Sequence, residues 1–132
     1  MDLTGRCYCG ETTLTARNPK TVLFCHCSDC RRSAGAPVAA FVEFSTVDFA
    51  LQTDHLKSIS VNAGVTRSFC GNCGSPIYGT YDYLPGMIYV SLGLLDQADL
   101  LPPTSHTHHS SKYRWLHINE DLPTEEEYRL DE

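Results

Sequence analysis

A chain of 132 residues that is 42% hydrophobic and 20% charged has the composition of a folded protein with a modest core, which excludes wholesale disorder. Its net charge of −6, counted with neutral histidines, argues against nucleic-acid binding, because phosphate recognition needs a basic surface. We expect residues 1–132 to form a single domain.

The N-terminal residues Met1–Gly5 do not combine a charged segment with an apolar run, so they do not predict a secretory signal peptide. No apolar stretch approaches the roughly 20 residues that a membrane-spanning helix needs. The sequence therefore predicts a cytoplasmic protein without a membrane partner.

The first third of the chain suits short extended segments and shows few helical periods. In chain order we expect a hairpin over Cys7–Ala16 that turns at Gly10, an extended segment over Thr21–Cys27, and a helical turn over Ser28–Ala34 that ends at Gly35. The helical turn folds the chain back on itself, so we expect it to bring the two ends of the segment 27–30 together.

The rest of the chain predicts strands separated by turns. The expected strands are Pro37–Phe44, Leu56–Val61, Val65–Cys70, Ser75–Tyr83 and Met87–Leu92. A helical turn is expected over Leu94–Leu101, and the acidic end, Leu122–Glu127, is expected to pack loosely or to cap a short helix. The sequence predicts a mainly β fold.

All seven cysteines fall in three clusters. The clusters are Cys7-Tyr8-Cys9, Cys25-His26-Cys27-Ser28-Asp29-Cys30 and Cys70-Gly71-Asn72-Cys73. An odd number of cysteines, one pair too close for relaxed disulfide geometry, and a reducing compartment all favour metal ligands over disulfides. Zinc is the metal that thiolates in such spacing select.

The two outer pairs predict one closed zinc site. Cys70 and Cys73 have the two-residue gap of a zinc knuckle, and Cys7 and Cys9 would point to one side if they lay on an extended strand. Four thiolates leave no position for a substrate, so we expect this zinc to be structural and to contribute folding free energy.

The central cluster predicts a second zinc with a vacant position. Three thiolates, from Cys25, Cys27 and Cys30, leave one tetrahedral position open, as in catalytic zinc sites. A thiol bound there would be ionised, and a carbonyl oxygen would be polarised. Because three thiolates soften the ion, thiol substrates are favoured over phosphates.

A fourth protein ligand would close this site, and the sequence leaves that alternative open. His26 is nearest, but strand alternation directs it away from the thiols. The histidines at 106, 108 and 109 are a second source of an imidazole ligand. A closed site would favour a non-catalytic zinc module that binds a protein partner. A thiol redox enzyme is disfavoured, because it needs a free cysteine.

Other side chains carry weaker predictions. We take His108 and Tyr113 as candidate catalytic donors for an oxygen that gains charge. The arginines beside the clusters, such as Arg31 and Arg67, are available to bind a carboxylate. Trp115 is expected to fill the core.

The order, spacing and flanking glycines of the three clusters resemble the glutathione-dependent formaldehyde-activating enzyme family, also called the centromere protein V-type domain. The resemblance implies a β-tent (Mss4-like) fold of small antiparallel sheets pinned by two zinc ions per chain. It implies structural zinc on the outer cysteine pairs and catalytic zinc on the central cluster.

The activity implied by the resemblance is that of a carbon–sulfur lyase. Such an enzyme adds a small aldehyde to a thiol or removes it, as in the union of formaldehyde with glutathione to give S-hydroxymethylglutathione. The expected partners are therefore a small thiol, with glutathione as the implied example, and an aldehyde.

Overall fold

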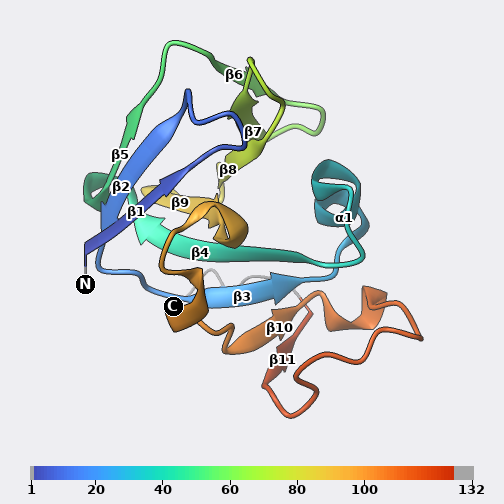
Figure 1. The fold of residues 1–132 in the computed structure, drawn as a ribbon. Helices are drawn as coiled ribbons and strands as arrows, with labels where there is room; N and C mark the ends of the chain where they lie inside the picture. The colour runs from blue at the N-terminus through green and yellow to red at the C-terminus, as the bar shows by residue number, and fades with distance from the viewer. Residues whose placement is uncertain (1, 127–132) are drawn as a thin grey trace.

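The computed structural model describes residues 2–126, and it confirms the prediction of a mainly β fold (Figure 1). The strands form two sheets. The smaller sheet is antiparallel, with the order β1 (Asp2–Arg6), β2 (Thr13–Arg17), β5 (Phe49–Gln52). The larger has the order β11 (Thr124–Glu125), β10 (Ser105–Thr107), β3 (Val22–Cys25), β4 (Ala39–Ser45), β9 (Met87–Ser91), β8 (Pro76–Tyr81), β7 (Val65–Cys70), β6 (Leu56–Ile59).

The main core lies between the two sheets. In β1 and β2 buried and exposed residues alternate, so that Leu3 and Leu14 point inward. They pack with residues of the larger sheet, among them Val42 and Phe44 of β4 and Val90 of β9. Alternation thus places one face of the small sheet on the core and leaves the other in solvent.

The larger sheet joins segments that are distant in the sequence. β10 runs parallel to β3, with Thr107 opposite Cys25, while β3 pairs with β4 in antiparallel fashion. All four residues of β3 are buried, as expected for a central strand. The β10–β3 pairing therefore places the loop after Thr107 beside the central cysteine cluster.

The helix α1 (Ser28–Ala34) confirms the predicted helical turn. Cys27 is its N-cap, and the Cys27 sulfur accepts a hydrogen bond from the backbone N–H of Cys30. Gly35 ends the helix in the left-handed conformation, with φ of 65°, which glycine adopts at little cost. Short 3₁₀ turns cover Thr46–Asp48 (η1), Leu92–Leu94 (η2), Ala98–Leu100 (η3) and His109–Ser111 (η4).

Three expectations about local structure are wrong. Cys7 and Cys9 lie in the turn between β1 and β2 rather than on a strand, because the Gly10 N–H bonds back to the Cys7 carbonyl. The acidic end forms β11, which pairs with β10, instead of a loose segment or a helix cap; Glu127 lies outside the described residues. Trp115 is 64% exposed rather than part of the core, and it stacks on Tyr113.

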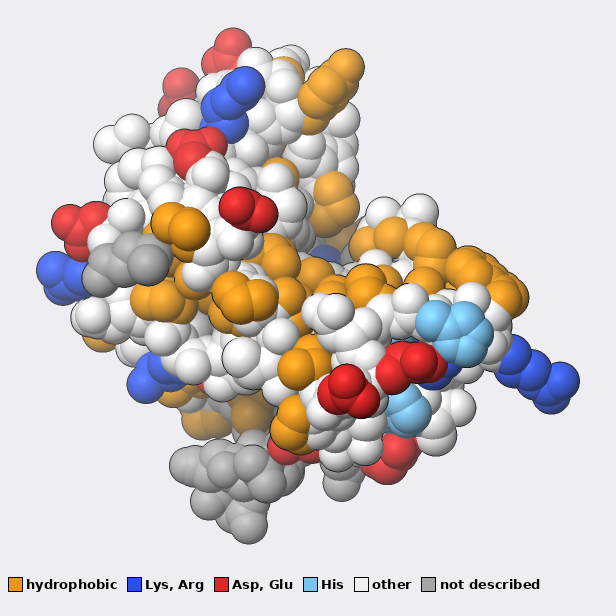
Figure 2. Space-filling view, turned by 60° about the horizontal axis from the view of Figure 1, so that its bottom comes forward, with side chains coloured by type: hydrophobic (Ala, Val, Ile, Leu, Met, Phe, Trp, Pro, Cys, Tyr) orange, Lys and Arg blue, Asp and Glu red, His pale blue; other side chains and the backbone are white. Residues whose placement is uncertain are grey.

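The chain has 10 lysines and arginines against 16 aspartates and glutamates, and the described residues show no concentration of basic side chains on the face in view (Figure 2). On the face shown in Figure 2 basic and acidic side chains are dispersed, and hydrophobic side chains reach the surface between them. In residues 2–126 no helix combines the length and the apolar character that crossing a membrane would require.

Gly5 allows β1 to approach the segment that follows β9. A Cβ at this position would lie 2.5 Å from the Leu94 carbonyl oxygen, which is a backbone atom and cannot turn aside. We expect Gly5→Ala to lower the free energy of unfolding by about 1–3 kcal/mol through overpacking. Chemical denaturation would measure this. The matched control is Gly93→Ala, because a Cβ at Gly93 would have no neighbour within 4 Å; equal stability of the two variants would contradict the prediction.

Candidate metal centres

The four outer cysteines come together as one compact group. The sulfur atoms of Cys7, Cys9, Cys70 and Cys73 all lie within 4.8 Å of one another. Cys9 Sγ is 3.5 Å from Cys7 Sγ and 3.9 Å from Cys70 Sγ. Tetrahedral zinc with Zn–S bonds of about 2.3 Å requires sulfurs about 3.8 Å apart. The donor set and its spacing therefore fit a zinc ion.

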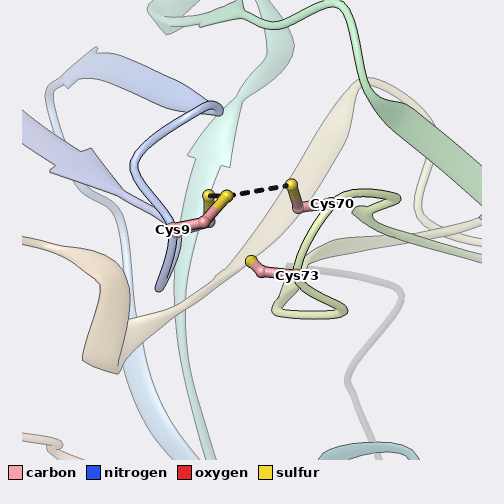
Figure 3. Close-up of side chains that lie close together, drawn as sticks. Cys9, Cys70 and Cys73 are labelled. Carbon is pink, nitrogen blue, oxygen red and sulfur yellow. Dashed lines mark hydrogen bonds between the residues drawn. The ribbon is translucent and has the colours of Figure 1, made fainter.

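Two tight turns aim these sulfurs at one point. Figure 3 shows Cys9 of the first turn facing Cys70 and Cys73 of the second. Gly10 and Gly74 both have a φ of +83°, which favours glycine and reverses the chain directly after each cysteine pair. The Tyr8 N–H donates to Ser75 Oγ at 3.0 Å and joins the turns directly. The group thus connects the β1–β2 hairpin to the end of β7.

Polar neighbours contact two thiols of this group. Asn72 Nδ2 donates to Cys9 Sγ at 3.2 Å, and Ser75 Oγ lies 3.2 Å from Cys73 Sγ. The hydrogen bond from Asn72 lowers the pKa of the Cys9 thiol, but burial and the thiols of Cys7 and Cys73 raise it, and the net shift is upward. The hydrogen bond from Ser75 is the main cause that lowers the pKa of the Cys73 thiol to about 5. Hydrogen bonds to the charged form make the thiolate easier to form, and the thiolate is the form that binds metal.

A second donor group is built from the central cluster and the tail. The ligand atoms of Cys25, Cys27 and His108 all lie within 4.8 Å of one another. Cys25 Sγ is 3.5 Å from Cys27 Sγ, although the expected extended segment over Thr21–Cys27 is shorter in the structure, where β3 ends at Cys25 and Cys27 is the N-cap of α1. The structure therefore adds His108 to the cysteines, and it draws this residue from the loop that follows β10.

Cys30 borders this group. Its thiol interacts with Cys25 and Cys27, and these hydrogen bonds are the first causes that raise the pKa of Cys30. The hydrogen bonds of Cys25 and Cys30 in turn hold the pKa of Cys27 far below that of an ordinary thiol. The α1 turn thus supplies the third thiol at short range.

The backbone presents His108 to the thiols. His108 has a φ of +52°, a left-handed conformation that is uncommon outside glycine and asparagine, and η4 begins at the next residue. The same loop holds Ser111, whose carbonyl accepts a hydrogen bond from the Arg31 guanidinium of α1. The loop is therefore fixed to the helix that carries Cys30.

His26 points away from the thiols, as strand alternation predicts. Its Nε2 lies 2.8 Å from His106 Nδ1, and His106 Nε2 lies 2.9 Å from the Asn119 carbonyl. Because the carbonyl only accepts, His106 carries its proton on Nε2 and His26 donates from Nε2. Burial, then His106, lowers the pKa of His26 to about 4. His26 is thus a neutral buried residue that orients the tail.

The sequence offered Arg67 as a residue available to bind a carboxylate, but it did not place Arg67 or Tyr81 beside Cys30. Arg67 Nη2 lies 3.7 Å from Cys30 Sγ. Burial, followed by the charge of Cys30, raises the pKa of the buried Tyr81 hydroxyl, which lies on β8. No short sequence motif indicates that Arg67 or Tyr81 lies near Cys30. Both residues reach Cys30 only because β7 and β8 pack near α1 in the folded chain.

Tyr113, the other candidate donor, lies beside the helix. Its ring sits 4.3 Å from the Arg31 guanidinium carbon and stacks on Trp115 at 5.3 Å. Tyr113 is 40% exposed, and it is not part of the donor group of Cys25, Cys27 and His108. The geometry therefore separates the two candidates and places His108 nearer the thiols.

A cleft of about 450 Å³ opens next to Cys30, between α1 and the β6–β7 hairpin. This volume is in the range of pockets that bind small molecules. Arg67 and Cys30 both line it. Of the central cluster and His108, Cys30 lines this cavity, whereas Cys25, Cys27 and His108 do not.

Fold and site together define a mainly β protein in which clustered cysteines could hold metal ions at two places. The family model of the glutathione-dependent formaldehyde-activating enzymes matches residues 2–111, and the chain belongs to this family. The two sheets joined at the cysteine turns are its β-tent fold.

A crystal structure of a Rhodobacter sphaeroides protein, Northeast Structural Genomics target RhR83, is similar with a TM-score of 0.61. It shares 16% sequence identity, and the match covers 92% of this chain and 98% of that one. At this identity the likeness supports the fold alone. No curated protein matched the chain.

Proposed function

We propose that this protein is a zinc-dependent carbon–sulfur lyase that adds a small aldehyde to a thiol or removes it. The name of the family suggests glutathione and formaldehyde as the pair, with S-hydroxymethylglutathione as the product. The supporting observation is the difference between the two places: four sulfurs make up the first group, while Cys30, beside the second, lines a cleft. The substrates of the protein would be small thiols and aldehydes in the cytoplasm.

We assign a structural zinc to Cys7, Cys9, Cys70 and Cys73, and a catalytic zinc to Cys25, Cys27 and Cys30. Zinc bound at the second place would ionise a thiol and polarise a carbonyl oxygen. The chain's own residues supply the rest of the environment.

Several residues around the central cluster would stabilise a thiolate bound there. The Arg67 guanidinium donates toward the Cys30 sulfur from a half-buried position and would stabilise negative charge on a thiolate there. Cys25 and Cys30 pack with apolar and aromatic residues, including Phe41 and Tyr89, which limit access of water. Charges interact more strongly in such surroundings than in water.

His108 is the donor that we favour over Tyr113. In its neutral form it offers one nitrogen that can hold or release a proton beside Cys25 and Cys27. A proton must leave the thiol and reach the aldehyde oxygen during addition, and a positioned imidazole suits this transfer. His108→Ala should lower the rate while leaving the cysteine ligands in place.

A second candidate function rests on the same residue. If His108 is a permanent fourth ligand, the second site is closed and the protein is a zinc module that binds a protein partner. X-ray absorption at the zinc edge distinguishes the two. A mean coordination that stays at seven sulfurs and one nitrogen per two ions after addition of a thiol would favour the module.

The activity is tested by ¹³C exchange NMR on labelled formaldehyde with glutathione. This reaction proceeds without an enzyme, so the observable is the exchange rate above background. We expect the zinc-loaded protein to accelerate exchange and protein treated with a chelator to lose the acceleration. Equal rates with and without the zinc-loaded protein would exclude this substrate pair.

A further inference from the structure

The cleft beside Cys30 combines apolar walls with a positive charge. Its walls include Phe41 from β4 and, from the β6–β7 hairpin, Ile59, Val61, Val65 and Phe69. Ile59 and Val61 are exposed although they are large and apolar. Exposed apolar side chains that line a cavity are typical of a ligand-binding surface.

The charges of the cleft favour an anion. Its charged residues are Arg32, Arg67 and Asp29. Asp29 accepts a hydrogen bond from Asn62 Nδ2 at 3.0 Å, which ties α1 to the hairpin loop. Two arginines against one acid give a local positive charge in a chain whose net charge is −6. This local excess is opposite in sign to the rest of the molecule.

Arg67 is placed to bind a carboxylate close to the sulfur of Cys30 in the central cluster. A guanidinium has five N–H donors, and the contact with Cys30 uses one edge of it. The remaining donors can form a paired contact with a carboxylate. Because Arg67 lies 3.7 Å from the Cys30 sulfur, that carboxylate would lie a few bonds from a thiol held at the cluster.

We propose that the thiol substrate carries a carboxylate near its sulfur and an apolar body that occupies this cleft, as N-acylated cysteines do. The inference rests on the proposed function for the identity of the reacting group. The proposed thiol differs from glutathione, a tripeptide in which the groups other than the thiol are polar and the carboxylates lie at the two ends of the molecule. If glutathione occupied the cleft, the hydrophobic walls would stay in contact with water or with the polar groups of the tripeptide.

The test is the affinity of the zinc-loaded protein for a set of thiols, measured by isothermal titration calorimetry. The probes are N-hexanoylcysteine, its amide, N-acetylcysteine and glutathione. We expect N-hexanoylcysteine to bind about tenfold tighter than each of the others, through apolar burial and through the charged contact. Equal or tighter binding of glutathione, or equal binding of the amide, would overturn the proposal.

Variants separate the two contributions. Arg67→Gln should remove the preference for the acid over its amide, and Val65→Ser should reduce the preference for the hexanoyl over the acetyl chain. Arg17→Gln is the control, because Arg17 pairs with Asp48 away from the cleft and the affinities should not change. Zinc content is measured for each variant, since Arg67 also contacts Cys30; Arg32→Gln repeats the charge test without that contact.

Failure of this proposal is distinct from failure of the proposed function. Selective binding without acceleration of aldehyde exchange would support the cleft and contradict the lyase. Acceleration with glutathione, without preference for N-hexanoylcysteine, would support the lyase and overturn the assignment of the cleft.

Discussion

Cys70→Ser is expected to abolish cooperative folding. Cys70 is fully buried at the end of β7, and its sulfur belongs to the group that ties β7 to the β1–β2 hairpin. Structural zinc contributes about 10–16 kcal/mol in small zinc-binding peptides, whereas a whole domain is stable by only about 5–15 kcal/mol. Losing even half of such a contribution would leave little net stability.

Circular dichroism and urea denaturation would measure this loss. A strong chelator added to the unchanged protein should have the same effect, because it removes the metal instead of the ligand. A sharp unfolding transition in Cys70→Ser at the midpoint of the unchanged protein would contradict the structural role. The matched comparison is a cysteine-to-serine substitution in the central cluster, Cys27→Ser.

Cys27→Ser is expected to abolish activity and spare the fold. Cys27 is the N-cap of α1, and its sulfur accepts the Cys30 N–H. Serine is a favoured N-cap and can accept the same hydrogen bond, so we expect the free energy of unfolding to change by only about 1 kcal/mol. The catalytic zinc, in contrast, would lose one of three thiolates. We expect the rate above background to fall at least about 100-fold, since even outer residues of metal sites contribute 10–100-fold.

The measurement is the ¹³C exchange rate of the variant beside the unchanged protein at equal concentration, with denaturation curves of both. Retained acceleration in a folded Cys27→Ser variant would contradict the assigned mechanism. A variant that does not fold would show that the second group is also structural, which is the property expected of the protein-interaction module.

The cysteine clusters made much of the site predictable. The spacing of Cys70 and Cys73 and the helical turn from Cys27 to Cys30 are local features, so the sequence alone indicates how each pair is held. Alternation along the chain likewise placed His26 away from Cys25 and Cys27. These expectations depend on neighbours within a few residues, and the helical turn is present as α1.

The rest depended on contacts between distant segments. His108 reaches the thiols because β10 pairs with β3 in parallel, and short strands such as Ser105–Thr107 give little sequence signal. Trp115 was expected in the core on hydrophobicity alone, but it stacks on Tyr113 at the surface. Cys7 and Cys9 share one group of four sulfurs through a tight turn, a geometry that Gly10 permits but strand alternation did not predict.

The most direct test of the central claim, two metal sites with separate roles, is native mass spectrometry that counts zinc ions per chain. We expect two ions in the unchanged protein, and one in Cys27→Ser, which keeps its fold. A count of one ion in the unchanged protein, or none in a folded Cys27→Ser variant, would contradict the division into a structural and a catalytic zinc.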